Sequence, residues 1–208
     1  MIGASIFSVV KRFLSIQIQT GIFWLMEYFK EILLQNEVIK GILNKAPSLE
    51  MKDWYLVAGC LAQTVWNHKH RHDLNYGISD YDLVYFDDSD ISFEAEDKYI
   101  KKGNKIFGDI PVEIRNQARV HLWYEKHFGF PIDPFPSVED AIYQYPTTAT
   151  AVGVRMEDSD LKVYAPYGLD DLMQLIVRPN KKKITEDIYN KKVEKWVQLW
   201  PMLKVVPW

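Results

Sequence analysis

The stretch that decides the fold is Ser79-Asp80-Tyr81-Asp82-Leu83-Val84-Tyr85-Phe86-Asp87. Its apolar and aromatic residues, bounded by turn-forming ones, are typical of a buried β-strand. Two carboxylates, Asp80 and Asp82, stand at its start and should project to the same face, with Cα atoms roughly 6–7 Å apart. Because like charges repel and burial penalises them, a cation would stabilise the pair, and magnesium prefers such oxygen ligands. Such pairs also arise by chance on exposed strands, so the spacing alone makes a metal site a hypothesis.

The composition indicates one ordered globular protein. The chain has 208 residues, of which 48% are hydrophobic and 14% aromatic, enough for one sizeable core. Its net charge of −3 gives no global field that would attract a polyanion, so generic nucleic-acid binding is not indicated. Locally, residues 80–97 hold eight acids and no base, whereas residues 175–208 hold eight Lys or Arg and three acids. Acidic metal ligands could thus face a basic phosphate-binding wall, although charge runs are more often solvated faces.

Residues 1–25 are expected to form an apolar extension of the main domain. Lys11, Arg12 and two glutamines interrupt the apolar runs, so no span of ~20 apolar residues predicts a transmembrane helix. The segment also lacks the pattern of a signal peptide. Either Met26 is the working start, or the segment is an amphipathic helix packed on the domain. The single cysteine, Cys60, excludes an intrachain disulfide and favours a cytoplasmic location with no membrane.

The remaining chain is predicted to be α+β, a mixed β-sheet flanked by helices. A catalytic core is expected over residues 26–130 and a C-terminal hairpin and helical lobe over residues 131–208, because three prolines follow the boundary. Strands are expected at 54–58, 79–87 and 110–115, with a hairpin from 148–156 and 161–165. Helices are expected at 26–43 with a break near Asn36, from Gly59 onward, and at 93–101, 116–128, after Ser137, 169–177 and 185–200.

The junction between the strand at 54–58 and the following helix is a candidate phosphate site. Gly59 opens that helix. Glycine permits close approach of the backbone, and the unpaired N–H groups of a first helical turn attract an anion. Such a junction alone is common and usually structural.

A third acid, Glu113, lies in the strand at 110–115. Glu113 and Arg115 should share one face of that strand, opposite its apolar residues. The alternative is an edge-strand glutamate paired with Arg115, and Pro111 fits an edge or a strand start. The loop with His68, His70 and His72 could ligate zinc but lacks the spacing of a recognised zinc motif.

These motifs, in this order, resemble the DNA polymerase β-like nucleotidyltransferase superfamily. The shared pattern is Ala58-Gly59-Cys60, then Asp80-Tyr81-Asp82, then Val112-Glu113-Ile114. Four longer runs are similar to a group of largely uncharacterised bacterial nucleotidyltransferase-family proteins, from about Trp54 to Asn180. They are LVAGCLAQTVWN (56–67), DYDLVYFDD (80–88), VEIRNQARVHLWYE (112–125) and PTTATAVGVR (146–155).

The resemblance implies a polymerase-β-like nucleotidyltransferase fold in which three acids hold two Mg²⁺ or Mn²⁺ ions against a nucleoside triphosphate such as ATP. Carried over by position, Asp80 and Asp82 would bind both ions, and Glu113 would complete the ion that activates an acceptor hydroxyl. Two cations roughly 3.5–4 Å apart can stabilise both the attacking oxygen and the departing pyrophosphate. Gly59 and the next backbone amides would bind the β- and γ-phosphates.

Two further residues complete the expected nucleotide site. Cys60 departs from the wider superfamily, where Ser or Gly is common, and a thiol donates only a weak hydrogen bond. Cysteine at this place is nevertheless similar to the closer bacterial group. Arg115 is the arginine expected at the nucleotide. By charge alone Arg119, Arg155 and Arg178 are also candidates, and each could equally form a surface ion pair.

The leading hypothesis is magnesium-dependent transfer of a nucleoside monophosphate from a triphosphate to a hydroxyl, with release of pyrophosphate. The acceptor could be a small molecule, a protein or RNA. The alternatives are a non-catalytic nucleotide-binding or adaptor module and a metal-dependent phosphohydrolase that uses the same acids on water. Magnesium-independent nucleotide binding would favour the adaptor, and release of free nucleoside monophosphate would favour the hydrolase.

Overall fold

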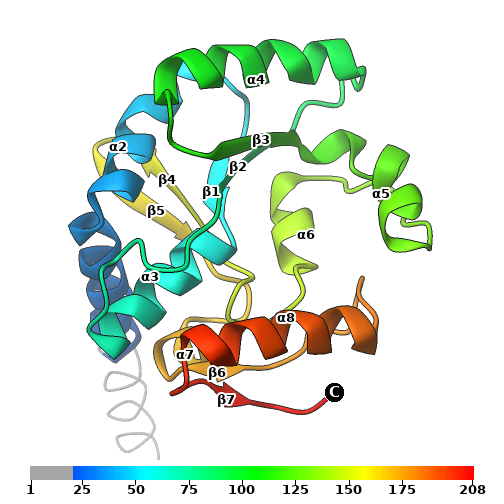
Figure 1. Ribbon diagram of the computed structural model, residues 1–208. Helices are drawn as coiled ribbons and strands as arrows, with labels where there is room; N and C mark the ends of the chain where they lie inside the picture. The colour runs from blue at the N-terminus through cyan, green and yellow to red at the C-terminus, as the bar shows by residue number, and fades with distance from the viewer. Residues whose placement is uncertain (1–20) are drawn as a thin grey trace, which may run out of the picture.

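A five-stranded mixed β-sheet forms the centre of the protein in the computed structural model, which describes residues 21–208. The strand order is β3-β2-β1-β4-β5 (Figure 1). Their bounds are β1 Tyr55–Val57, β2 Tyr81–Tyr85, β3 Val112–Asn116, β4 Gly153–Glu157 and β5 Asp160–Tyr164. Strand β1 is antiparallel to β2 and β4, β2 is parallel to β3, and β4 is antiparallel to β5. The predicted α+β class with a mixed sheet and flanking helices is therefore confirmed.

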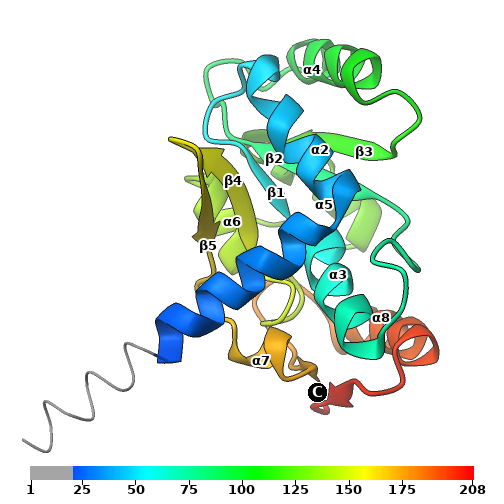
Figure 2. The same cartoon turned by 90° about the vertical axis from the view of Figure 1, so that its left-hand side faces the viewer.

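The helices begin with a helical stretch over residues 21–35, followed by Asn36, whose side chain caps α2. The others cover the sheet and its ends: α2 Glu37–Lys45, α3 Gly59–His70, α4 Phe93–Phe107, α5 His121–Phe128, α6 Val138–Tyr143, α7 Asp170–Met173 and α8 Glu186–Leu199. Short 3-10 turns occur at Ala46–Leu49 and Gln117–Arg119. Figure 2 shows the 21–35 stretch running from the β4–β5 hairpin toward α2, where the buried Phe29, Ile32 and Leu33 anchor it.

The two faces of the sheet have different surroundings. Leu56, Leu83 and Ile114 belong to the main hydrophobic core, which α2, α3 and α4 help to form. On the opposite face, Tyr55, Val57 and Val84 form a small buried cluster with Val138 and Ile142 of α6, and four partly buried residues pack against it: Ala58, Phe86, Tyr145 and Tyr164. Because side chains alternate along a strand, polar residues two positions from Tyr55, Val57 or Val84 point to this same face of the sheet. That face is thus only partly covered by apolar packing.

Several expected elements have different bounds in the structure. The helix expected at 169–177 ends at Met173, because Leu175 has a positive φ of 62° that a right-handed helix cannot accommodate. Residues Ile176–Val177 instead form β6, paired in parallel with β7 at Lys204–Val205. The helix expected at 116–128 begins only at His121, since Asn116 ends β3 and its side chain accepts a hydrogen bond from the Ala118 N–H.

Two further boundaries also shift. Helix α4 runs to Phe107, beyond the expected end at 101, and the first hairpin strand starts at Gly153. The break at Asn36, the helix start at Gly59, the Ser137 cap and the last helix agree with the sequence prediction.

The hairpin expected in the C-terminal lobe extends the central sheet, since β4 pairs directly with β1. The proposed boundary at residue 131 stays a prediction. Residues 1–20 of the expected extension lie outside the described residues, and residues 21–25 belong to the first helical stretch. Within residues 21–208, no helix has the length and apolar character needed to cross a membrane.

Candidate active site

The three predicted acids lie at the same end of two neighbouring strands. In the sheet register, Val57 of β1 is opposite Asp82 of β2, which is opposite Glu113 of β3. Residues opposite one another in a sheet project to the same face, about 4.8 Å apart along the hydrogen-bonding direction. Asp80 stands immediately before β2, on the chain leading into Asp82. The fold therefore brings Asp82 and Glu113 side by side, on the face of the sheet that carries the small cluster with α6.

Asp82 is the electrostatic centre of this group. Burial, the charge of Asp80 and the charge of Glu113 together raise the pKa of Asp82 from its ordinary value to about 7. Lys192 and Arg115 act in the opposite direction but more weakly. An excess of negative charge that raises a carboxyl pKa is the environment that a cation would relieve. The donor set, three carboxylates, also suits Mg²⁺ or Mn²⁺.

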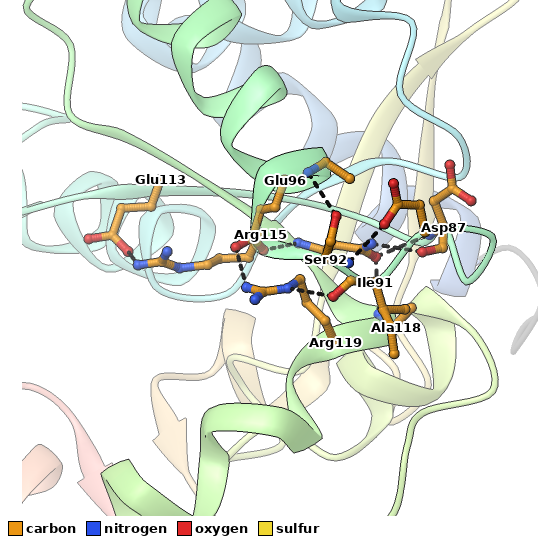
Figure 3. Close-up of polar contacts among 11 residues, drawn as sticks. Asp87, Ile91, Ser92, Glu96, Glu113, Arg115, Ala118 and Arg119 are labelled. Atoms are coloured by element: carbon orange, nitrogen blue, oxygen red, sulfur yellow. Dashed lines mark hydrogen bonds and ion pairs between the residues drawn. The ribbon is translucent and has the colours of Figure 1, made fainter.

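Glu113 forms an ion pair with Arg115. Its Oε2 atom lies 3.1 Å from Arg115 Nη2, and both side chains are roughly half exposed (Figure 3). This is the edge-strand pairing that the sequence offered as an alternative. Across residues 21–208, no three His, Cys, Asp or Glu side chains are close enough to form a ready metal site. A three-acid site would thus require a rotation of the Glu113 side chain about its own bonds.

The glycine turn lies directly beside the acids. Val57, in register with Asp82, is followed by Ala58 and then by Gly59, the first residue of α3. Ala58 has φ 60° and ψ −123°, a strained conformation for a residue with a side chain, and no side chain caps the helix. The first N–H groups of α3 therefore have no side-chain acceptor, which favours an anion there.

Cys60 contributes differently from the serine found in the wider superfamily. Its side chain is buried, and the Sγ atom donates to the Val57 carbonyl at 3.3 Å. Burial and the nearby charge of Asp82 hold the pKa of the thiol well above its ordinary value. The thiol therefore stays neutral and faces the protein interior, so any contact of Cys60 with a nucleotide would be through its backbone N–H.

A buried polar chain fixes the loop that leads into Asp80. Trp200 Nε1 donates to Asn67 Oδ1 at 2.7 Å, and Asn67 Nδ2 donates to the carbonyls of Leu74 and Tyr76. At the end of the loop, the Tyr81 hydroxyl donates to Asn75 Oδ1. The C-terminal helix thus helps to position the aspartates.

The three histidines do not gather around a metal. The His70 ring contacts the Trp66 carbonyl and accepts from the Met202 N–H, and His68 is hydrogen bonded to Tyr28. The zinc hypothesis is therefore not supported within the described part of the chain.

Three of the four candidate arginines are engaged in ion pairs away from the acids. Arg119 pairs with the buried Glu96 at 2.6 Å, as Figure 3 shows. Arg155 pairs with Glu157, and Arg178 pairs with Asp171. Only Arg115 both contacts one of the three acids and lowers the pKa of another.

Two neighbours of Asp82 were missed by the sequence reasoning. Lys192 of α8 lowers the pKa of Asp82 by its charge, and burial beside Asp82 and Cys60 raises the pKa of Tyr145 well above its usual value. The basic excess in residues 175–208 was the available signal for Lys192. Nothing in the sequence around Tyr145 marks it, because its position depends on the long-range path of the chain after α6.

The sequence matches the family model described as nucleotidyltransferase over residues 44–205, most of its length, and the chain therefore belongs to that family. This confirms the expected superfamily. As a member, the protein is a transferase whose substrate is a nucleotide.

A solved structure supports the same conclusion. An NMR structure described as revealing "a CCA-adding enzyme head domain" is similar to this chain with a TM-score of 0.73 and 26% sequence identity. The similarity covers 88% of this chain and 96% of that one. No curated protein matches the sequence.

Proposed function

We propose that the protein transfers a nucleoside monophosphate from a nucleoside triphosphate to a hydroxyl group in a Mg²⁺-dependent reaction. The observation that carries this proposal is the row formed by Val57, Asp82 and Glu113, which sets two acids beside the glycine-led start of α3. Asp80, Asp82 and Glu113 would hold the cations. When bound, the ions would supply positive charge that stabilises the attacking oxygen and the departing pyrophosphate.

The residues of the chain have separate roles in this reaction. The backbone amides of Gly59 and Cys60 bind the triphosphate, and Arg115 binds a phosphate oxygen once Glu113 has turned away from it. The acceptor oxygen forms a bond to the α-phosphorus, and the bond from that phosphorus to the oxygen bridging to the β-phosphorus breaks. The hydroxyl proton passes to a Glu113 carboxylate oxygen and then to solvent, while pyrophosphate leaves.

The acceptor belongs to one of three classes: a small molecule, a protein or RNA. The similar structure described as a CCA-adding enzyme head domain favours RNA among them. The cytoplasm is the proposed location.

The test is incubation of the purified protein with Mg²⁺, each labelled nucleoside triphosphate and a cell extract. Asp80→Asn, Asp82→Asn and Glu113→Gln should each abolish labelling of the acceptor. Asp97→Asn is the matched control, because Asp97 pairs with Lys101 on the surface of α4. Labelling that survives the first three substitutions would overturn the proposal.

A non-catalytic nucleotide-binding module is the second candidate. The ion pair between Glu113 and Arg115 favours it, since it engages one of the three acids. In that case nucleotide binding would not depend on Mg²⁺, and no labelled product would form with any triphosphate.

A further inference from the structure

A stacked pair of tyrosines lies at the end of α6. The rings of Tyr143 and Tyr167 are nearly parallel, with centroids 5.2 Å apart and an interplanar angle of 11°. The Tyr167 hydroxyl donates to the Tyr143 carbonyl at 2.9 Å, which fixes the second ring relative to the first. Tyr143 is 36% exposed despite this packing. The pair is therefore a rigid aromatic platform at the surface.

One lysine lies over this platform, and the residue before it lies over another aromatic ring. Lys182 Nζ lies 4.4 Å from the centroid of the Tyr143 ring, and Lys181 Nζ lies 4.9 Å from that of Trp208. Neither lysine, nor Lys183 after them, forms an ion pair within the described residues. We call Tyr143, Tyr167, Lys181 and Lys182 the tyrosine–lysine surface.

Asn180 holds the lysines against the platform. Its side chain is almost fully buried, and Nδ2 donates to the carbonyls of Tyr143 at 2.8 Å and Tyr145 at 2.9 Å. The backbone N–H of Asn180 also donates to the Pro146 carbonyl. The position of the lysine run is thus set by the fold, and it does not depend on lysine side-chain contacts.

The segment after α6 that Asn180 holds also leads toward the acids. Tyr145, whose carbonyl shares the Asn180 amide with that of Tyr143, packs against the cluster that contains Val57, the register partner of Asp82. Figure 1 shows α6 and α8 meeting below the sheet, where this segment runs. A chain molecule lying on the tyrosine–lysine surface would have its end directed at the acids.

Aromatic platforms combined with unpaired cations are the means by which proteins bind single-stranded nucleic acid. Bases stack on the rings, and the phosphates meet the cations. The proposed triphosphate site is at Gly59 and Arg115, so the two successive lysines, one of them over the stack, are cations beyond those that this nucleotide needs. The acids Glu139 and Asp140 of α6 accept hydrogen bonds from the Tyr55 and Ser137 hydroxyls, and within residues 21–208 neither forms an ion pair with these lysines.

We propose that the tyrosine–lysine surface binds the end of a single-stranded RNA and presents its terminal hydroxyl as the acceptor. This inference rests on the proposed nucleotidyl transfer and names its acceptor. Because the net charge is −3, binding is confined to this surface and falls as salt rises.

The test is fluorescence anisotropy with a labelled single-stranded RNA of about twelve nucleotides, long enough to cover one such groove. The buffer contains EDTA and either 50 or 200 mM salt. Lys181→Ala with Lys182→Ala should weaken binding about tenfold and lower the salt slope by roughly 0.7 for each phosphate that no longer meets a lysine. Tyr143→Leu should weaken it at least about fivefold, because the ring that holds both Tyr167 and Lys182 in the stacking surface is then lost.

Lys101→Ala with Lys105→Ala is the matched control, since both lysines are exposed on α4, above the opposite edge of the sheet. This control should leave RNA binding within about twofold of the parent, because surface charges away from a site contribute little. Calorimetry with Mg²⁺ and a non-hydrolysable ATP analogue should give unchanged affinity for all four proteins. Loss of ATP affinity in the Lys181/Lys182 variant, with RNA binding intact, would show that the surface serves the triphosphate and would overturn the inference.

Two further outcomes separate this inference from the proposed function. An unmodified protein that binds no RNA at 50 mM salt, yet labels a small acceptor in extract, would overturn the inference and leave nucleotidyl transfer standing. RNA binding that depends on the tyrosine–lysine surface, without transfer to any acceptor, would support the surface and contradict the transfer.

Discussion

The two ends of strands β2 and β3 carry acids in opposite conditions. At the start of the strands, Asp82 is crowded by Asp80 and Glu113, and its pKa rises to about 7. At the other end, the pKa of Asp87 is lowered, chiefly by the Ser89 hydroxyl. Glu96, fully buried there, accepts hydrogen bonds from the Asn116 N–H at 2.8 Å and from Arg119 at 2.6 Å (Figure 3).

The difference separates a structural acid from a candidate ligand. At the other end of the strands, or far end, the protein itself supplies the hydrogen-bond partners. Arg119 also donates to the Ile91 carbonyl, and the Asn116 side chain bonds both the N–H and the carbonyl of Asp87. The start of the strands, or near end, holds three acids, and among residues 21–208 the one cation in contact with any of them is Arg115. A buried acid with complete partners stabilises the fold, whereas clustered acids without them destabilise it unless a cation binds.

The largest expected effect is on catalysis at the near end. Asp82→Asn should lower the rate of transfer by about a thousandfold, because several kcal/mol of charge stabilisation would be lost with the cations. Glu96→Gln, an isosteric change at the far end, should leave the rate of the folded protein within about threefold, since Glu96 only supports the loop. Initial-rate measurements on both variants compare the two ends directly, and equal losses would remove the distinction between them.

The next effect is on stability at the far end. Arg119→Ala leaves Glu96 buried without its cation and should lower the free energy of unfolding by about 3 kcal/mol. Replacing both residues by methionine should cost less, because no charge is then left unpaired. Urea unfolding measures both values. A loss below about 1 kcal/mol for Arg119→Ala would place the pair among ordinary surface ion pairs.

Gly59→Ala probes the anion site without a large change in the fold. A Cβ atom there would lie 3.3 Å from Gln63 Nε2, the end of a flexible side chain, so a small adjustment can accommodate it. Stability should change by less than about 1 kcal/mol, since alanine is the better helix former. Nucleotide affinity should fall about tenfold, because the methyl group obstructs close approach to the first amides. Calorimetry that shows unchanged affinity would remove Gly59 from the nucleotide site.

The smallest effect is a pH dependence in the metal-free protein. The pKa of Asp82 is higher in the folded than in the unfolded state, so the folded state retains a proton between about pH 4 and 7 that the unfolded state has lost. Its contribution to stability therefore falls as pH rises through that window, by on the order of 1 kcal/mol for a partly exposed group. In EDTA, Asp82→Asn should lose less stability than the parent between pH 5 and 8. Identical pH profiles by urea unfolding would contradict the charge crowding at Asp82.

The sequence predicts the strand and the helix start that carry the candidate site, because local residue patterns there agree with the fold. The strand at β2 and the helix start at Gly59 follow from apolar runs and a glycine, and the residues that carry the family resemblance lie on them. The register that sets Asp82 beside Glu113 does not follow from local patterns, since it depends on a crossover through α4. The same holds for the ion pair of Glu113 with Arg115, which the sequence left as an alternative.

The elements that differ from expectation share a physical cause. Leu175 adopts a positive φ because its carbonyl accepts from the Lys204 N–H across the β6–β7 pair, a partner 29 residues away in sequence. Glu96 lies in the helix expected at 93–101, where a charged residue would ordinarily face solvent. It is buried instead, and it accepts hydrogen bonds from the Asn116 N–H and from Arg119. In both cases a long-range partner overrides a local propensity.

The most direct test is the affinity of the protein for a non-hydrolysable ATP analogue, measured by calorimetry with Mg²⁺ and again in EDTA. If the near ends of β2 and β3 form a cation site, Mg²⁺ should tighten binding at least about tenfold in the parent protein and have no effect in Asp82→Asn. Equal affinity with and without Mg²⁺ in the parent would contradict the account.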